Sequence, residues 1–195
     1  MSRKAEIERI TKETTVRLSL DLDGEGRSDI STGVPFFDHM LTLVAVHGFF
    51  DITLQAQGDL EVDSHHTVED VGIVLGSAVA SAIGDRKGIR RYGYAVTPMD
   101  EALATVALDL SRRPYLVFQV PACDTAETSF NRILAKEFFK SVANHGGMNL
   151  HLTVPYGENE HHVLEAAFKS FGRALRQAVD MDPRSGGVRS SKGSL

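Results

Sequence analysis

Two short segments of the sequence combine histidine and glutamate at a spacing that suits metal binding. They are His65–Glu69 and His161–Glu165, and both read H-H-x-x-E. An apolar run rich in small residues follows each segment, at 71–83 and 166–179, so each is predicted to open a helix. Residues four apart share one helix face, so the first histidine and the glutamate of each copy can reach one ion. The second histidine points about 100° away and would serve a different ion.

The duplication of this segment strengthens the metal-binding interpretation. A single copy would be weak evidence, because histidine and glutamate four residues apart also occur on solvated helix faces. Two copies in matching context are stronger evidence, because chance rarely repeats a ligand pattern. The repeat also extends beyond the two segments. Glu101–Leu110 matches Glu13–Leu22, and the amphipathic segment Ile133–Ala143 matches the apolar segment that follows Pro35.

The repeat predicts one further ligand in each half of the chain. His39 lies 26 residues before His65, and Glu137 lies 24 residues before His161. Both fall in the first predicted helix of their repeat. The resulting set mixes imidazole with carboxylate and has no thiolate, so it suits Mn²⁺ or Fe²⁺ better than a thiolate-type zinc site. The eight predicted metal ligands are His39, His65, His66, Glu69, Glu137, His161, His162 and Glu165.

The sequence pattern around these residues predicts an α+β fold of two fused β-β-α-β-α repeats, which would position the candidate ligands. Each repeat would lay two helices on one face of a four-stranded sheet, with halves at 1–95 and 96–181 and a flexible tail at 182–195. Residues 6–22 show continuous β-type alternation, and the turn Asp23–Gly26 predicts a hairpin into residues 27–30. Further strands are expected at 51–57, 101–110, 115–120 and 148–154.

Composition limits the classes of function. The chain has 195 residues, 42% of them apolar, which is enough for one domain or two small fused halves. A net charge of −5 and no long basic run argue against nucleic acid as a partner. Cys123 is the only cysteine, which excludes an internal disulfide. The charged start of the chain does not resemble a signal peptide, and no run approaches the ~18 apolar residues of a membrane span, so we expect a cytoplasmic protein.

Three other interpretations of the same residues stay open. The first is a dinuclear metallohydrolase that activates water against a phosphorylated small molecule. The second is a helical metal-storage or redox bundle, although the alternating segments 14–22 and 102–110 argue against an all-helical fold. The third is a protein whose metals only hold subunits together.

Four motifs of the chain closely resemble the imidazoleglycerol-phosphate dehydratase family. They are Gly33–Leu41, Asp63–Asp70, Gly157–Lys169 and Ser190–Gly193, and the resemblance covers essentially the whole chain. It implies conversion of imidazole glycerol phosphate to imidazole acetol phosphate and water in histidine biosynthesis. It also implies a fold resembling the second domain of ribosomal protein S5. Two Mn²⁺ ions per active site would bind the substrate imidazole as imidazolate, in a homo-oligomer of 24 subunits with active sites between subunits.

The resemblance also assigns roles to individual residues. It implies all eight metal ligands named above, although family members usually carry histidine where Glu137 stands. A carboxylate oxygen is still a good Mn²⁺ ligand. Glu13 matches the family's acidic residue near the substrate and is the expected catalytic acid or base and a substrate contact. The residues expected to bind the substrate phosphate are Arg91, Arg113, Lys169, Ser191 and Lys192.

Overall fold

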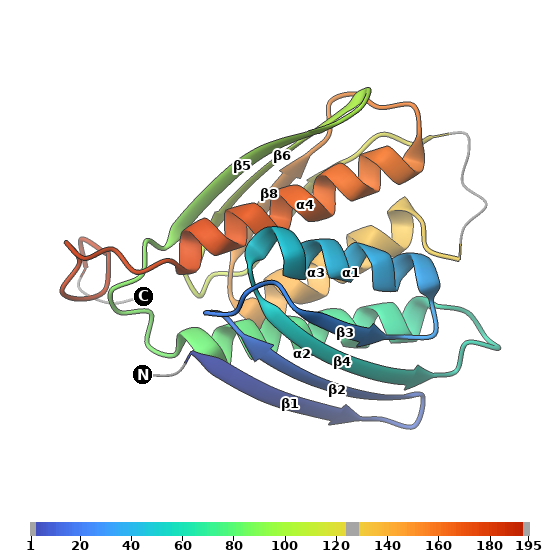
Figure 1. The fold of residues 1–195 in the computed structure, drawn as a ribbon, viewed down its shortest axis with the longest axis horizontal. Helices are drawn as coiled ribbons and strands as arrows, with labels where there is room; N and C mark the ends of the chain where they lie inside the picture. Colours follow the sequence, from blue (N-terminus) through green and yellow to red (C-terminus); the bar gives the residue numbers. More distant parts are fainter. Residues whose placement is uncertain (1–2, 124–128, 193–195) are drawn as a thin grey trace.

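Two four-stranded sheets form the outer layers of the molecule, and four helices lie between them (Figure 1). The computed structural model describes residues 3–123 and 129–192. The first repeat contains β1 (Lys4–Ile10), β2 (Thr14–Asp21), β3 (Ser28–Ser31), α1 (Pro35–Gly48), β4 (Asp51–Gly58) and α2 (His65–Ile83). The second repeat contains β5 (Tyr92–Met99), β6 (Ala102–Asp109), β7 (Tyr115–Gln119), α3 (Arg132–Gly146), β8 (Asn149–Thr153) and α4 (Glu160–Val179).

The two sheets share one topology, which confirms the predicted duplication. Their strand orders are β1-β2-β4-β3 and β5-β6-β8-β7. In each sheet the third strand of the repeat pairs in parallel with the fourth, and the other pairs are antiparallel. The fold is therefore the predicted α+β architecture, with four strands and two helices in each repeat. It excludes the all-helical bundle.

Two details of the predicted strands are wrong. Residues 6–22 form a hairpin, because the side chain of Thr11 accepts the backbone N–H groups of Glu13 and Thr14 and closes a turn without glycine or proline. The expected hairpin from β2 into residues 27–30 does not form. Instead β3 pairs in parallel with β4, with Ile30 opposite Leu54.

Strand β5 was missed because its inward face is unusually small. Gly93, Ala95 and Thr97 face α4, while Tyr92 and Tyr94 point to solvent, so the strand lacks the usual pattern of large apolar residues inside. A Cβ atom at Gly93 would lie 1.9 Å from the carbonyl oxygen of Ala174, so α4 approaches this strand closely. The expected junction between residues 95 and 96 falls inside β5.

The helices pack across the two repeats. α1 packs against α4, and α2 packs against α3, so each pair joins one helix from each half. Glycine allows the backbones to touch. A Cβ atom at Gly172 would lie 2.8 Å from the carbonyl oxygen of Val44, and one at Gly76 would lie 2.7 Å from that of Val142. These two contacts fix how far each helix can slide along its partner.

Helix α2 corrects the expectation about apolar runs. Its 19 residues, His65–Ile83, contain a window with a mean hydropathy of 1.2, which is long and apolar enough to cross a membrane by length and composition alone. In the fold, 61% of that window is buried, against α3 and the sheet formed by β1, β2 and β4. α2 is the core helix of the first repeat.

The glycine contacts lead to a prediction about stability. Gly76→Ala and Gly172→Ala would each gain up to about 1 kcal/mol from helix propensity. We expect both variants to lose stability nonetheless, because forcing a methyl group against a fixed backbone costs about 1–3 kcal/mol. Urea unfolding of the chelator-treated protein measures the difference. Gly186→Ala is the control, because nothing lies within 4 Å of a Cβ at that position. A gain in stability in both helix variants would show that the helices do not meet at these glycines.

Candidate active site

All four helices begin at the same end of the molecule, at the right in Figure 1. Each H-H-x-x-E segment forms the first turn of its helix. Asp63 accepts the backbone N–H of His65 at 2.7 Å, and Asn159 accepts that of His161 at 2.9 Å. Asn159 is the N-cap of α4, whereas Asp63 precedes the N-cap Ser64 of α2; both side chains satisfy an N–H group that the helix leaves unpaired. The sequence spacing therefore becomes a fixed arrangement at one end of the fold.

One of the two predicted clusters is already assembled. His39, His161 and Glu165 have ligand atoms within 4.8 Å of one another, and they are the one such group among the residues that the structure describes. Oε2 of Glu165 lies 3.2 Å from Nε2 of His39 and 3.0 Å from Nε2 of His161. Both rings are about half exposed, whereas Glu165 is buried. Two imidazoles and a carboxylate converging at a surface suit a divalent transition-metal ion.

The carboxylate of this cluster is held in its charged form. Burial alone would raise the pKa of Glu165, but hydrogen bonds from Lys169, His39 and His161 outweigh it and lower the pKa to about 2. Nζ of Lys169 lies 2.6 Å from Oε1 of Glu165. Lys169 therefore lies beside the metal-ligand candidates, not at the C-terminal tail. Glu165 is a preformed anion at neutral pH.

The second cluster occupies the equivalent place on α2 and α3. Gly172 lies seven residues after Glu165 and contacts Val44, which lies five residues after His39. In the same way, Gly76 lies seven residues after Glu69 and contacts Val142, which lies five residues after Glu137. Glu137 is thus the structural counterpart of His39, as the repeat predicted. Its carboxylate lies 3.0 Å from Nζ of Lys140, and it does not converge with His65 and Glu69 as closely as the first cluster does.

The second histidine of each segment turns away from the first. The rings of His65 and His66 are inclined at 86°, and those of His161 and His162 at 81°. Nδ1 of His66 lies 3.0 Å from Asp59, and Nδ1 of His162 lies 2.7 Å from Glu101. These carboxylates raise the pKa of both histidines. A carboxylate on Nδ1 is the arrangement that often orients a metal-binding histidine, although Nε2 of His162 also lies 3.6 Å from Asp100.

Sequence reasoning missed both carboxylates, although the repeat carried a signal for one. Glu101 begins the segment that matches Glu13–Leu22, so it is the repeat counterpart of Glu13. Its Oε1 accepts the backbone N–H groups of Glu158 at 3.1 Å and Asn159 at 2.9 Å, and its Oε2 faces His162. Nothing in the spacing marks Asp59, because Pro155 stands at the matching position, 96 residues later, in the loop before α4.

Glu13, the predicted acid or base, lies at the same end of the molecule as the clusters. Its Oε2 is 3.9 Å from Nδ1 of His66, and its side chain is 56% exposed. It lines a shallow pocket of about 310 Å³ together with Asp59 and Glu61. An exposed carboxylate beside a candidate metal ligand can exchange protons with a bound substrate.

Four of the five predicted phosphate-binding residues line a second pocket. It has a volume of about 880 Å³ and is formed by Arg91, Tyr92, Ser111, Arg112, Arg113, Arg189, Ser190, Ser191 and Lys192. Arg91 is buried and pairs with Asp109 through Nε at 2.6 Å and Nη2 at 3.0 Å, while its Nη1 donates to the carbonyl of Arg189 at 2.6 Å. Arginine has five N–H donors, so Arg91 holds the tail in place and keeps donors for an anion.

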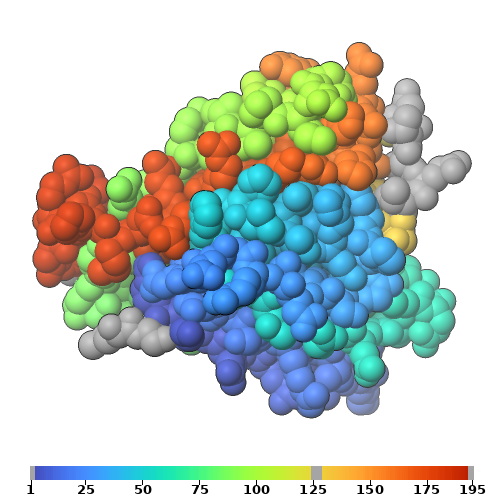
Figure 2. All heavy atoms as spheres, viewed as in Figure 1, coloured from blue at the N-terminus to red at the C-terminus, as the bar shows by residue number. Residues whose placement is uncertain are grey.

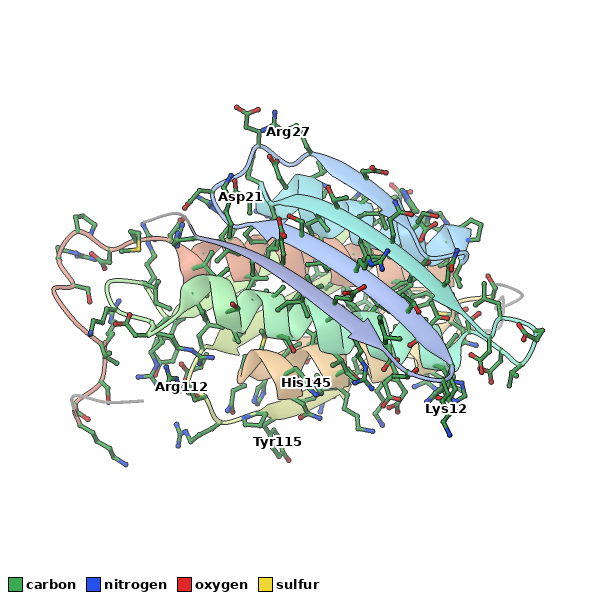
Figure 3. All side chains as sticks on the ribbon, turned by 90° about the horizontal axis from the view of Figure 1, so that it is seen from below. Lys12, Asp21, Arg27, Arg112, Tyr115 and His145 are labelled. Atoms are coloured by element: carbon green, nitrogen blue, oxygen red, sulfur yellow. The ribbon has the colours of Figure 1, made fainter. Side chains whose placement is uncertain are left out.

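The cationic pocket and the metal-ligand clusters lie at opposite ends of the chain. Figure 3 places Lys12, next to Glu13, at one end and Arg112 at the other. The tail protrudes at the end far from the helix starts (Figures 1 and 2). α4 has 20 residues and connects the two ends, which corresponds to about 30 Å. A single chain therefore does not bring the clusters and this pocket together.

The fold and the clusters define a class of protein before any comparison is made. It is a duplicated α+β protein that presents two sets of histidine and carboxylate side chains at one end, one of them convergent, and a cationic pocket at the other. A family model described as imidazoleglycerol-phosphate dehydratase matches residues 32–175. The chain belongs to the imidazoleglycerol-phosphate dehydratase family, which are hydro-lyases of histidine biosynthesis.

Relatives with the same name cover the whole chain. Imidazoleglycerol-phosphate dehydratase of Desulfosudis oleivorans is 61% identical over 100% of both chains, and that of Geobacter metallireducens is 56% identical over 100% of both. The crystal structure of the Staphylococcus aureus enzyme is similar with a TM-score of 0.82 and 37% identity, covering 92% of this chain and 99% of that one. The Pyrococcus furiosus enzyme in complex with (S)-C348 gives a TM-score of 0.86 and 37% identity, covering 97% and 100%.

The contact between Asp59 and His66 gives a testable prediction. Asp59→Asn keeps the shape of the side chain but removes the charge that orients His66. We expect affinity for Mn²⁺ to fall by roughly 10- to 100-fold, as is typical when a carboxylate behind a metal-binding histidine is lost. Isothermal titration calorimetry measures the change. Asp85→Asn removes an exposed carboxylate paired with Lys87 and should leave the affinity unchanged. Equal affinities for the two variants would mean that Asp59 does not position His66 for metal.

Proposed function

We propose that this chain dehydrates imidazole glycerol phosphate to imidazole acetol phosphate in an active site that contains two Mn²⁺ ions. Membership of the family gives the reaction. The observation that supports a metal-dependent site is the convergence of His39, His161 and Glu165 within 4.8 Å at the start of α1 and α4. The donor set of imidazole and carboxylate fits Mn²⁺.

Each ion would be held by one cross-repeat helix pair. His39, His161 and Glu165 would hold one, and His65, Glu69 and Glu137 the other, while His66 and His162 would reach ions bound elsewhere. Bound there, the two cations would supply Lewis-acid stabilisation of negative charge on the substrate's imidazole ring. The protein's part would be to orient that ring so that Glu13 can reach the substrate. Exposed rings such as His39 and His161 leave space for the substrate.

Glu13 is the residue that we assign to proton transfer. The substrate loses a hydroxyl group from the carbon beside its imidazole and a proton from the next carbon, and the resulting enol becomes the ketone. The proton and the hydroxyl leave together as water, so the reaction is balanced without another reactant. Glu13 lies within 3.9 Å of His66 and is held by the turn that Thr11 closes. It can accept the proton on carbon or protonate the leaving hydroxyl.

The substrate phosphate would bind in the pocket at the other end of the chain. Arg113 is exposed there, and Ser191 and Lys192 come from the tail. Arginine binds phosphate through paired N–H donors, and a lysine adds charge without fixed geometry. Lys169 would contribute from the metal end of another subunit, since it lies beside Glu165.

This separation supports active sites shared between subunits in a large homo-oligomer, for which we propose 24 subunits. The clusters of one chain can meet the cationic pocket of a second chain only if the ends of neighbouring subunits come together. The outward face of the second sheet also favours association. It exposes Tyr92 and Tyr94 on β5 and Tyr115 on β7, whereas the first sheet exposes Lys4, Glu6 and Arg17.

The proposed reaction can be tested directly. The protein loaded with Mn²⁺ should convert imidazole glycerol phosphate to a ketone that absorbs as its enolate in alkali. The same protein treated with a chelator should be inactive, and Mn²⁺ should restore it. Release of inorganic phosphate in place of the ketone would instead support the metallohydrolase, and ketone formation after complete metal removal would contradict the dinuclear site.

Arg113 gives a second prediction, on substrate binding. Arg113→Ala removes an exposed side chain and should leave the fold intact, but it should raise KM by roughly 10- to 100-fold because a charged hydrogen bond contributes about 1.5–3 kcal/mol. Arg17→Ala is the control, since it removes an equally exposed arginine from the outer face of the first sheet. A KM equal to that of the control would exclude the pocket as the phosphate site.

The same variant tests whether sites are shared. His161→Ala should be inactive because it removes a metal ligand, and Arg113→Ala should be impaired in binding phosphate. If one site takes its metal ligands and its phosphate contacts from different chains, dissociating and reassembling a mixture of the two variants recovers activity with wild-type KM. No recovery from the mixture would place both functions in the same chain.

A further inference from the structure

The two metal clusters lie in matching places but do not have the same charge. His39 on α1 lies five residues before Val44, which contacts Gly172 on α4. Glu137 on α3 lies five residues before Val142, which contacts Gly76 on α2. The cluster of His39, His161 and Glu165 therefore has one carboxylate among three ligands. The cluster of Glu137, His65 and Glu69 has two. The two repeats have the same backbone arrangement but differ in the chemistry of one ligand.

The neighbouring lysines, one in each cluster, leave this difference of one charge in place. In the first cluster Lys169 is largely buried, and its Nζ lies 2.6 Å from Glu165, so one cation balances one carboxylate. In the second, Nζ of Lys140 lies 3.0 Å from Glu137, and the Lys140 side chain is 53% exposed. One cation stands there beside two carboxylates, so the second cluster is the more negative of the two.

The positions of the lysines are not themselves related by the repeat. Lys169 follows Glu165 by four residues, and the matching position after Glu69 is Ile73. Lys140 follows Glu137 by three residues, and the matching position after His39 is Thr42. Each cluster thus has its own cation, on a different helix of the pair. The difference in charge between the clusters therefore comes from Glu137, and each lysine offsets one carboxylate of its own cluster.

Ligand type decides which cations such clusters accept. Mg²⁺ prefers oxygen donors and binds through one or two carboxylates with water completing its shell. Imidazole donors favour the later transition metals and bind Mg²⁺ poorly. Added negative charge increases the affinity for any divalent cation. The cluster with two carboxylates therefore meets the requirements of Mg²⁺, and the cluster with two imidazoles does not.

We propose that the two metal sites of this chain are inequivalent: the Glu137 site exchanges Mn²⁺ for Mg²⁺, whereas the His39 site retains Mn²⁺ against Mg²⁺. Glu137 is then the residue that determines metal specificity, and the chain can hold a mixed pair of ions. This inference rests on the proposed two-metal site and concerns which cation each half of it selects.

Metal exchange tests the proposal without an activity assay. The assembled protein is loaded with Mn²⁺, freed of excess metal, and dialysed against millimolar Mg²⁺; elemental analysis then gives Mn²⁺ and Mg²⁺ per chain. We expect the wild-type protein to lose half of its Mn²⁺ and to gain an equal amount of Mg²⁺. Electron paramagnetic resonance of the retained Mn²⁺ should show one type of site.

Reciprocal variants identify the residue responsible. Glu137→His makes both clusters carry two imidazoles and should retain all of the Mn²⁺, whereas His39→Glu makes both carry two carboxylates and should lose nearly all of it. Glu6→His, on the exposed face of β1, is the control and should behave as the wild type. Thermal unfolding of the metal-free variants checks that each is folded.

The outcomes separate this inference from the proposed function. If the wild-type protein loses both ions together, or keeps both, the two sites are equivalent and the inference is overturned. If the protein binds fewer than two Mn²⁺ ions per chain before the Mg²⁺ challenge, the proposed two-metal site itself is wrong. If half of the Mn²⁺ exchanges both in the wild-type protein and in Glu137→His, residues other than Glu137 cause the difference between the two sites.

Discussion

Backbone contact between helices of opposite repeats is the constraint on which the candidate site depends. Gly76 on α2 and Gly172 on α4 have no side chain, so α3 and α1 approach until backbone atoms meet. Sliding or separation of either pair would move a ligand on one helix away from its partners on the other. Neither repeat can form a cluster alone, because each cluster takes residues from both halves. Under the proposed function, the duplication of the fold is therefore also the reason for two metal sites.

The ends of the molecule divide the chemistry. Helix starts supply imidazoles and carboxylates, and the turn between β1 and β2 supplies Glu13, while the opposite end supplies arginine and the tail. Arg91 is held within its own chain by Asp109 and the carbonyl of Arg189. Under the proposed function, a substrate that contacts both kinds of residue must lie between two subunits.

Local patterns in the sequence predicted much of this structure. The helical periodicity predicted helices α2 and α4 and the pairing of His161 with Glu165. The internal repeat predicted that His39 and Glu137 occupy equivalent positions. Strand β5 could not be predicted, because Gly93 and Ala95 face α4 where large apolar residues are usual. The partners Asp59 and Asp109 depend on loop and strand geometry that spacing does not encode. The placement of Arg113 and His161 at opposite ends is a property of the fold, which no motif contains.

The central claim is that metal ligands are brought together by the helix pairs α1 with α4 and α2 with α3. Anomalous diffraction from crystals of the Mn²⁺-loaded protein measures this directly, because each manganese gives a peak whose ligands can be identified. The account predicts one peak within bonding distance of His39, His161 and Glu165, and a second within bonding distance of His65, Glu69 and Glu137. A peak that joins His39 to His65 and Glu69 within one chain, or manganese bound away from both helix pairs, would contradict it.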